Sequence, residues 1–424
     1  MTSPVWQATV TDDTGDVLPG AQIDVVIEST GTDATLFSNR AGTTSLSNPF
    51  FADSEGFAQF YTDAGAYRIT ATASGGGTTR TWRYVSLFDF DANVGTAAGE
   101  VPTNADIAYK LFKKTNSSTV IFTKTGNFTV DTSQEFYAEA GGSLLTIASG
   151  TAITMPSATT GTDYAIWLKT DGTLEATTNF TSPPATDARK IGGFHYAAGG
   201  NAAAQAGGNS TAQINEYSFW DLSFRPACDD PRGMTLVAGS FWSDIYLLNT
   251  NPDVNGTSKY GETIADGSSP PVIPATLGGN GSTTYGSLTW FEAMSIATAM
   301  GKKPFTQPQF MTAMYGVTEE SSVVSNPGST GLDAPRTSRW GVMQATGNLR
   351  IWAQDRGGDY STGGWNANTD GFGSEYDAPN VSQLGGDWID GVSAGSRCSG
   401  WSKPASDSAS SGGMRLVCDH LRLD

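Results

Sequence analysis

A run of alternating residues constrains the fold of this chain more than any other feature of its sequence. Apolar Ile23, Val25 and Ile27 recur at every second position, and residues 67–71 repeat the pattern. A period of two is typical of a strand that buries one face. Turn-forming residues separate the runs, at positions 12–15, 18–20 and 53–56. We therefore expect residues 1–90 to form a small β-sandwich-like domain.

The charge and hydropathy of the chain exclude two classes of partner. The 424 residues include 24 Lys and Arg against 42 Asp and Glu, a net charge of −18. Because nucleic-acid phosphates require clustered cations, we expect no nucleic-acid binding. No apolar run reaches the ~18 residues of a membrane span, and we expect neither membrane insertion nor a secretory signal. Abundant Gly, Ser, Thr and Asn are typical of an extracellular or virion β protein, and a virion protein leaves the cell by lysis.

The middle of the chain predicts a linker and then a second β domain. Residues 91–104 are small, polar and unpatterned, which is typical of a linker. Residues 105–222 hold several strand-like runs, and Asp171–Gly172 predicts a hairpin because its residues accept a positive φ. Residues 199–213 hold few bulky side chains, so we expect a long loop or a segment that lies against a partner chain.

The sequence changes character at residue 223. Seven of the 11 Trp residues lie in residues 223–424. Two helices are expected, one after the capping box Thr289-x-x-Glu292 and one after Thr306-x-x-Gln309. The rest reads as short strands and long Gly-, Ser- and Asn-rich loops, which predicts an α+β domain. The fold class is therefore mostly β with an α+β C-terminal domain.

The N-terminal domain resembles a module that is common at the N-termini of phage tail-fibre and baseplate proteins. The resemblance rests on Asn48-Pro49-Phe50, on Asp53 to Gly56, and on the aromatic and glycine residues between Phe57 and Tyr67. It implies that this domain attaches the chain to the rest of a tail fibre or baseplate.

The C-terminal domain resembles the C-type-lectin-like fold in its formylglycine-generating-enzyme branch. Five motifs carry the resemblance in the right order: Trp290–Ala293, Gly301–Pro304, Gly341–Asn348 with Trp352, Gly385–Trp388, and Arg415. It implies that a lectin-like domain at residues 223–424 follows the two β domains expected from the earlier residues.

A longer resemblance links residues from about 105 to 424 to the phage major tropism determinants. Long matching strings carry it, at residues 151–167, 188–226, 230–248 and 417–424. Members of that family are receptor-binding tips of tail fibres, diversified by a retroelement. The resemblance implies a homotrimer at the distal tip of a virion tail fibre, with residues 105–222 as the trimerisation domain and a bacterial surface receptor as the partner. The first 90 residues depart from the family, which has a small β-prism there.

The same resemblance implies a hypervariable segment, Gly385–Asp424, that presents the receptor-binding face. The family's variable positions fall on Asp387, Ile389, Asp390, Gly391, Ser393, Gly400, Ser402, Lys403, Asp407, Ala409, Ser411 and Gly412. Between them lie residues expected to support the face, above all Trp388, Arg397, Trp401 and Arg415. The family diversifies AAY codons at adenines. Such codons reach every residue found at these positions except Lys403.

Catalysis is the main alternative function. A formylglycine-generating oxidase uses two closely spaced cysteines, whereas Cys398 and Cys418 lie 20 positions apart outside any pair motif. A polysaccharide depolymerase uses two carboxylates about 5–10 Å apart. With 42 acidic residues, adjacent pairs such as Asp229–Asp230 or Glu319–Glu320 are more simply solvated loop charges. We therefore expect no enzyme and no catalytic residues.

The chain has only two histidines and three cysteines, and it lacks the motifs of known calcium-dependent lectins. The Glu-Pro-Asn and Gln-Pro-Asp tripeptides of calcium-dependent lectins are absent, and residues 365–368 only partly match their Trp-Asn-Asp motif. We expect no cofactor and no defined metal ligands, although a structural Ca²⁺ or Mg²⁺ on an Asp-rich loop stays open. His195 and His420 are interpreted as structural. The odd cysteine count leaves at least one thiol free, and the apolar or small-residue surroundings of Cys228, Cys398 and Cys418 predict buried free thiols.

Overall fold

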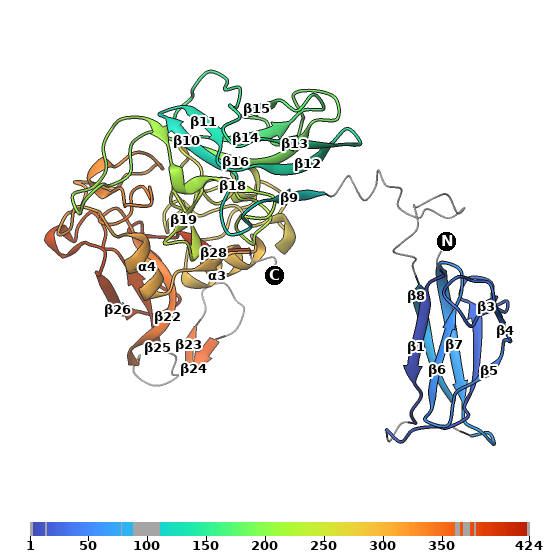
Figure 1. The fold of residues 1–424 in the computed structure, drawn as a ribbon. Helices are drawn as coiled ribbons and strands as arrows, with labels where there is room; N and C mark the ends of the chain where they lie inside the picture. Colours follow the sequence, from blue (N-terminus) through green and yellow to red (C-terminus); the bar gives the residue numbers. More distant parts are fainter. Residues whose placement is uncertain are drawn as a thin grey trace. The chain divides into compact units, whose positions relative to one another are not determined.

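The computed structural model divides into two compact units, Met1–Asn104 and Ala105–Asp424 (Figure 1). It describes residues 3–12, 15–77, 79–87, 111–360, 365–367, 374–376 and 379–421. The predicted linker at residues 91–104 lies outside these ranges. Within them, no helix combines the length and the apolar character that crossing a bilayer requires.

Two antiparallel four-stranded sheets build the first unit, in the orders β1-β6-β3-β4 and β5-β2-β7-β8 (Figure 1). The strands are β1 Val5–Thr9, β2 Gln22–Ile27, β3 Leu36–Phe37, β4 Ser45–Leu46, β5 Phe50–Phe51, β6 Phe57–Tyr61, β7 Gly65–Thr72 and β8 Thr79–Leu87. Both sheets contribute to one core, with Ile23 from β2 and Phe60 from β6 fully buried in it. The unit is therefore a β-sandwich, as the alternating runs predict.

The period of two holds through β7 and fails at the end of β2. Tyr67, Ile69 and Ala71 are all buried, as expected. Ile27, expected inside, is 36% exposed, and Val26 is buried in its place. The carbonyl of Ile27 accepts a hydrogen bond from the Gly31 amide in the turn that follows. The alternation ends there, at the last residue of β2, where the turn begins.

Residues 111–222 form the first part of the second unit. Its sheets have the orders β10-β11, β13-β12-β9 and β15-β14-β16-β17, and β18 also pairs with β16. The strands are β9 Phe112–Lys114, β10 Phe122–Gly126, β11 Thr129–Thr132, β12 Phe136–Ala140, β13 Ser143–Ile147, β14 Thr162–Leu168, β15 Leu174–Thr177, β16 Arg189–Ala197, β17 Gln213–Ile214 and β18 Trp220–Asp221. The short helix η1 Glu216–Ser218 lies between β17 and β18. They enclose a core of their own. The predicted hairpin joins β14 to β15, and Gly172 has a φ of 84° in its turn.

The lectin-like part of the same unit combines short sheets with two main helices. The sheets have the orders β19-β20-β28-β21, β26-β25-β22-β27 and β23-β24. The strands are β19 Met234–Val237, β20 Phe241–Asp244, β21 Lys303–Pro304, β22 Arg350–Tyr360, β23 Trp365–Ala367, β24 Ser374–Tyr376, β25 Pro379–Leu384, β26 Ser399–Lys403, β27 Gly412–Gly413 and β28 Leu416–Asp419. The helices are α2 Pro252–Asn255, η2 Ala275–Leu277, α3 Trp290–Ala299, α4 Gln307–Ala313, η3 Ala334–Arg336 and η4 Gly391–Ser393.

Both main helices begin where the sequence predicts. Thr289 caps α3 and Thr306 caps α4, and each forms a complete capping box with the residue three positions on. Two orphan backbone amides are thereby satisfied at each helix start. The two helices pack on the cores beneath β22 and β25, and so support the sheet from which the variable segment emerges.

The small-residue segment at 199–213 is the long loop that its composition predicts. It lies against the lectin-like part, with the Gly207 amide bound to the Gly316 carbonyl and the Gly208 amide to the Ala334 carbonyl. A Cβ on Gly207 would lie 2.3 Å from the carbonyl oxygen of Pro335. Two backbones approach closely here, and bulky side chains would prevent it.

Candidate functional site

The variable segment leaves the sheet at the end of β25 through two glycines. Gly385 and Gly386 have φ values of 91° and 75°. A Cβ on Gly385 would lie 2.8 Å from the ring of Phe310, and one on Gly386 would lie 2.8 Å from the Cβ of Ala394. Only glycine combines this backbone with such close packing. The turn therefore fixes where the segment begins above α4.

Backbone hydrogen bonds hold the segment in place. The Gly385 amide donates to the Cys398 carbonyl and the Gly395 amide to the Gly385 carbonyl. Further on, β26 pairs with β25, and β27 pairs with β22 in parallel. Because these bonds involve no side chain, they can form whichever residues occupy the variable positions.

Ten of the twelve implied variable positions reach the surface. Five are exposed: Ile389, Ser393, Gly400, Ser402 and Ala409. Five more are partly exposed: Asp390, Gly391, Lys403, Asp407 and Ser411. Ile389 is 73% exposed and its neighbour Val392 is 76% exposed. The face therefore exposes two neighbouring apolar side chains to water.

Two of the twelve positions do not face outward. Asp387 and Gly412 are buried, so neither residue presents a side chain at the surface, contrary to the implied assignment. Asp387 is 0% exposed, and its Oδ1 accepts the Ile389 amide at 2.8 Å. Gly412 lies in the short strand β27. Both positions shape the turn and the sheet beneath the face.

Arg350, at the start of β22, ties the segment to the sheet. Its guanidinium donates two hydrogen bonds to Asp390, at 3.0 Å from Nε and 2.6 Å from Nη2. Its Nη1 also lies 3.2 Å from Oδ2 of Asp387. Burial raises the pKa of Asp390, but the hydrogen bonds from Arg350 and from the Asp387 amide, together with the charge of Arg350, outweigh it, and the net pKa is below the ordinary value. The sequence offers no local sign of this contact because 37 positions separate Arg350 from Asp387.

The expected supporting residues differ in their surroundings. Trp388 is half-buried against the core under α4, and Trp401 is half-buried with its ring near Gly357. Arg415 is 0% exposed and donates to four carbonyls, those of Asp244, Ile245, Met343 and Gln344. Burial lowers the pKa of Arg415 to about 9. Arg397 is exposed, and its supporting role stays a prediction.

A hollow of about 1020 Å³ borders the face beside η4. One wall consists of residues outside the variable segment, from α4 and the loops after it, including Met311, Tyr315 and Trp340. Residues 392–398 form the other wall. Glu319 closes its edge, where it accepts the Ser396 hydroxyl at 2.6 Å and the Ser396 amide at 2.8 Å. The sequence draws attention to Glu319 only as part of an acidic pair; its contact with Ser396, 77 positions away, arises through the fold.

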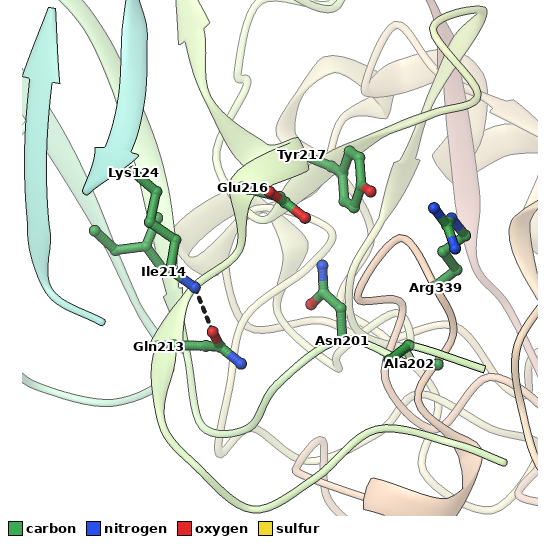
Figure 2. A pocket seen from close by; sticks show the side chains of 9 residues that line it. Lys124, Asn201, Ala202, Gln213, Ile214, Glu216, Tyr217 and Arg339 are labelled. Atoms are coloured by element: carbon green, nitrogen blue, oxygen red, sulfur yellow. Dashed lines mark hydrogen bonds between the residues drawn. The ribbon is translucent and has the colours of Figure 1, made fainter. Parts of the chain in front are cut away.

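A second hollow, of about 340 Å³, lies away from the variable segment (Figure 2). Its side chains come from both parts of the second unit: Lys124, Asn201, Gln213, Glu216, Tyr217 and Arg339. Lys124 donates a hydrogen bond to Gln213 (Figure 2). Burial lowers the pKa of Lys124. This lining offers mixed charge and hydrogen-bonding groups, without Cys or His.

Two of the four carboxylates considered for catalysis, and one of the two histidines, are engaged in the fold. Asp230 is paired with Arg232 at 2.6 Å, and Glu319 holds Ser396. His195 is buried between Asp163, at 3.1 Å, and the Tyr246 hydroxyl, at 3.0 Å.

The second histidine, His420, is also held by a hydrogen bond. Nδ1 of His420 accepts the indole N–H of Trp242 at 2.9 Å. Among the residues that the structure describes, no group of three His, Cys, Asp or Glu side chains is placed to hold a metal ion. The partial lectin motif at 365–368 includes Asn368, which lies outside the described residues.

The cysteines are arranged differently from the pair considered for an oxidase. Cys228 and Cys418 are buried, as expected, whereas Cys398 is only half-buried. Cys418 lies against Cys228, whose amide donates to its Sγ at 3.0 Å. Burial raises the pKa of Cys398, which lines the hollow beside η4.

Comparisons with known proteins agree with this arrangement. The family model described as "Mtd second domain" matches residues 120–221. The chain is 46% identical over 343 residues to the "Tail fiber receptor-binding protein" of Bordetella phage BPP-1, covering 78% of this chain and 90% of that protein. The solved U1 variant of the major tropism determinant has a TM-score of 0.73 at 46% identity, covering 75% of this chain and 88% of the other. The M1 variant has a TM-score of 0.74 at 42% identity, covering 84% and 93%. At this identity and coverage, the chain belongs to the major tropism determinant family.

Proposed function

We propose that this chain is a phage tail-fibre receptor-binding protein whose lectin-like face, residues 387–412, recognises a receptor on the bacterial surface. The observation that carries the proposal is the separation between this face and its support. Ten variable positions reach solvent, while backbone hydrogen bonds and buried side chains hold the segment from below. Binding residues on loops of a rigid scaffold are typical of recognition surfaces.

The chemistry of the face suits a weak individual contact. Apart from Ile389, its exposed variable residues are small: Ser393, Gly400, Ser402 and Ala409. Small polar residues give adaptable hydrogen bonds, but tight paratopes usually add aromatic anchors. In our proposal, a homotrimer at the distal tip of the fibre supplies the missing affinity through avidity. A monomer and a trimer should differ in apparent affinity by orders of magnitude, and equal values would reject the avidity argument.

The other parts of the chain complete the proposal. Residues 105–222 trimerise the tip, and the N-terminal sandwich attaches it to the rest of the virion tail. A retroelement diversifies the face, so the gene should carry AAY-derived codons at the variable positions and a near-copy of this region beside a reverse-transcriptase gene. Lys403 is the position least suited to this origin.

The proposed activity is binding without chemistry and without a cofactor. The named receptor-binding relatives support this, as do the structural roles of Asp230, Glu319 and the two histidines. Incubation with host surface polysaccharide should release no reducing ends, whereas release would favour a depolymerase. Cell binding should be the same in a chelator as in Ca²⁺ or Mg²⁺, and a loss in the chelator would reveal a structural ion.

Two matched substitutions test the face directly. Ile389→Asp places a charge on the face, and Val254→Asp places one at a similarly exposed residue of α2, 70% exposed. Binding of the labelled full-length protein to receptive bacteria should fall at least tenfold for Ile389→Asp and stay unchanged for Val254→Asp. Circular dichroism should show both proteins folded. Equal binding by the two variants would contradict the proposal.

A further inference from the structure

The last strand of the fold continues into a short pairing with the segment that begins the lectin-like part. The Ala227 amide donates to the Asp419 carbonyl and the Leu421 amide to the Arg225 carbonyl, both at 2.9 Å. Pro226 and His420 are thereby opposite each other in an antiparallel bridge. Their own amides and carbonyls make none of these bonds, so they form a non-hydrogen-bonded pair.

The same register brings two cysteines together. Cys228 and Cys418 lie two positions beyond this isolated bridge on the two segments. Cα atoms of residues that face each other across an antiparallel pair are about 4.5–5.5 Å apart, and disulfides span Cα separations of about 4.4–6.8 Å. The 3.0 Å hydrogen bond from the Cys228 amide to Sγ of Cys418 shows that the side chain crosses to the opposite strand. Both thiols lie in one buried cluster with Trp242 and Met234.

The surroundings make Cys418 the more reactive thiol. Its pKa is lowered to about 7, chiefly by the adjacent Cys228 side chain and also by backbone amides and the nearby Lys302. The pKa of Cys228 is raised by the adjacent Cys418 side chain and by burial. A thiolate beside a thiol is the arrangement that thiol–disulfide exchange requires.

We propose that Cys228 and Cys418 are a modification site, which a low-molecular-weight disulfide oxidises to an intramolecular disulfide bond. The Cys418 thiolate attacks one sulfur of the small disulfide and releases the first small thiolate. Cys228 then loses its proton and attacks the Cys418 sulfur, which releases the second. One Sγ–Sγ bond forms, the small disulfide gains two electrons, and two small thiols carry the cysteine protons away.

The bond would enclose the whole binding face. Cys228 and Cys418 are 190 positions apart, and the loop between them contains both main helices and residues 387–412. Closing a long loop stabilises a fold chiefly by restricting the unfolded chain. The bond therefore stabilises the domain independently of the residues at the variable positions. Because both thiols are buried, exchange takes place during folding or local opening.

The test uses the reduced full-length protein in a mixture of reduced and oxidised glutathione. One sample stays native, and a second refolds from denaturant in the same mixture. Both are then denatured with an alkylating agent, and the alkylated cysteines are counted and mapped by mass spectrometry. Reduced protein should carry three labels, and oxidised protein one, on Cys398, with a peptide that links Cys228 to Cys418.

Variants separate this bond from other oxidation. Cys398→Ser should still form it, and Cys228→Ser and Cys418→Ser should not. Oxidation should raise the thermal midpoint of the wild type and of Cys398→Ser by roughly 5–15 °C. Three labels in both the native and the refolded samples, or a bond that includes Cys398, would overturn the proposal. Cell binding is not part of the readout, so the outcome does not depend on the proposed function.

Discussion

Replacing Asp387 tests whether the side chain at this variable position stabilises the fold. Asp387→Ala removes the carboxylate oxygen that accepts the Ile389 amide at 2.8 Å, a charge-assisted bond of about 1.5–3 kcal/mol. It also removes the partner 3.2 Å from Arg350. Arg350 keeps Asp390 and is partly exposed, so this second loss is about 0.5–1 kcal/mol. The free energy of unfolding should therefore fall by about 2–4 kcal/mol.

Two controls divide this loss into its parts. Asp387→Asn keeps an acceptor for the Ile389 amide and removes only the charge, so it should cost about 1 kcal/mol or less. Ser393→Ala, at an exposed position of the same segment, should change the free energy of unfolding by at most about 0.5 kcal/mol. Urea denaturation of the three variants measures these values. If Asp387→Ala were as mild as Ser393→Ala, the structural role of Asp387 would be refuted.

Three further predictions concern the support of the face. Arg415→Met leaves four buried carbonyls without their donor and should lower the free energy of unfolding by about 3 kcal/mol or more; a fully stable variant in urea denaturation would contradict this. The pKa of Asp390 is lower in the folded chain than its ordinary value of 3.8, so its stabilisation is present at neutral pH and is lost as the pH falls through the folded pKa. The difference in stability between wild type and Asp390→Asn should accordingly shrink from pH 7 to about pH 3, and a constant difference would disprove the linkage. Gly207→Ala combines a φ of 79° with a 2.3 Å approach to the Pro335 carbonyl, and should lower the thermal midpoint by several degrees, whereas Ala203→Gly in the same loop should change it little.

The features that the sequence predicts best are local. The capping boxes at Thr289 and Thr306 place both helix starts, because the donors and acceptors lie within four residues of each other. The alternation in β7 and the hairpin at Gly172 are equally local. The break at Ile27 depends on the turn that follows β2, which a period of two does not include.

The features that the sequence does not predict depend on contacts between distant residues. Asp387 is one of twelve aligned variable positions, but its burial follows from the Gly385–Gly386 turn and from Arg350 on another strand. The exposure of Arg397 is likewise set by the loop it occupies and not by its place between variable positions. Cys418 meets Cys228 because of a strand register that spans 190 positions.

Exchange of residues 387–412 between two natural variants tests the central claim most directly. The exchange is made in the phage, and adsorption is scored on bacteria that distinguish the two parents. If this face selects the receptor, each recombinant phage should adsorb to the hosts of the parent that donated the segment. Host range that stays with the rest of the chain would contradict the account.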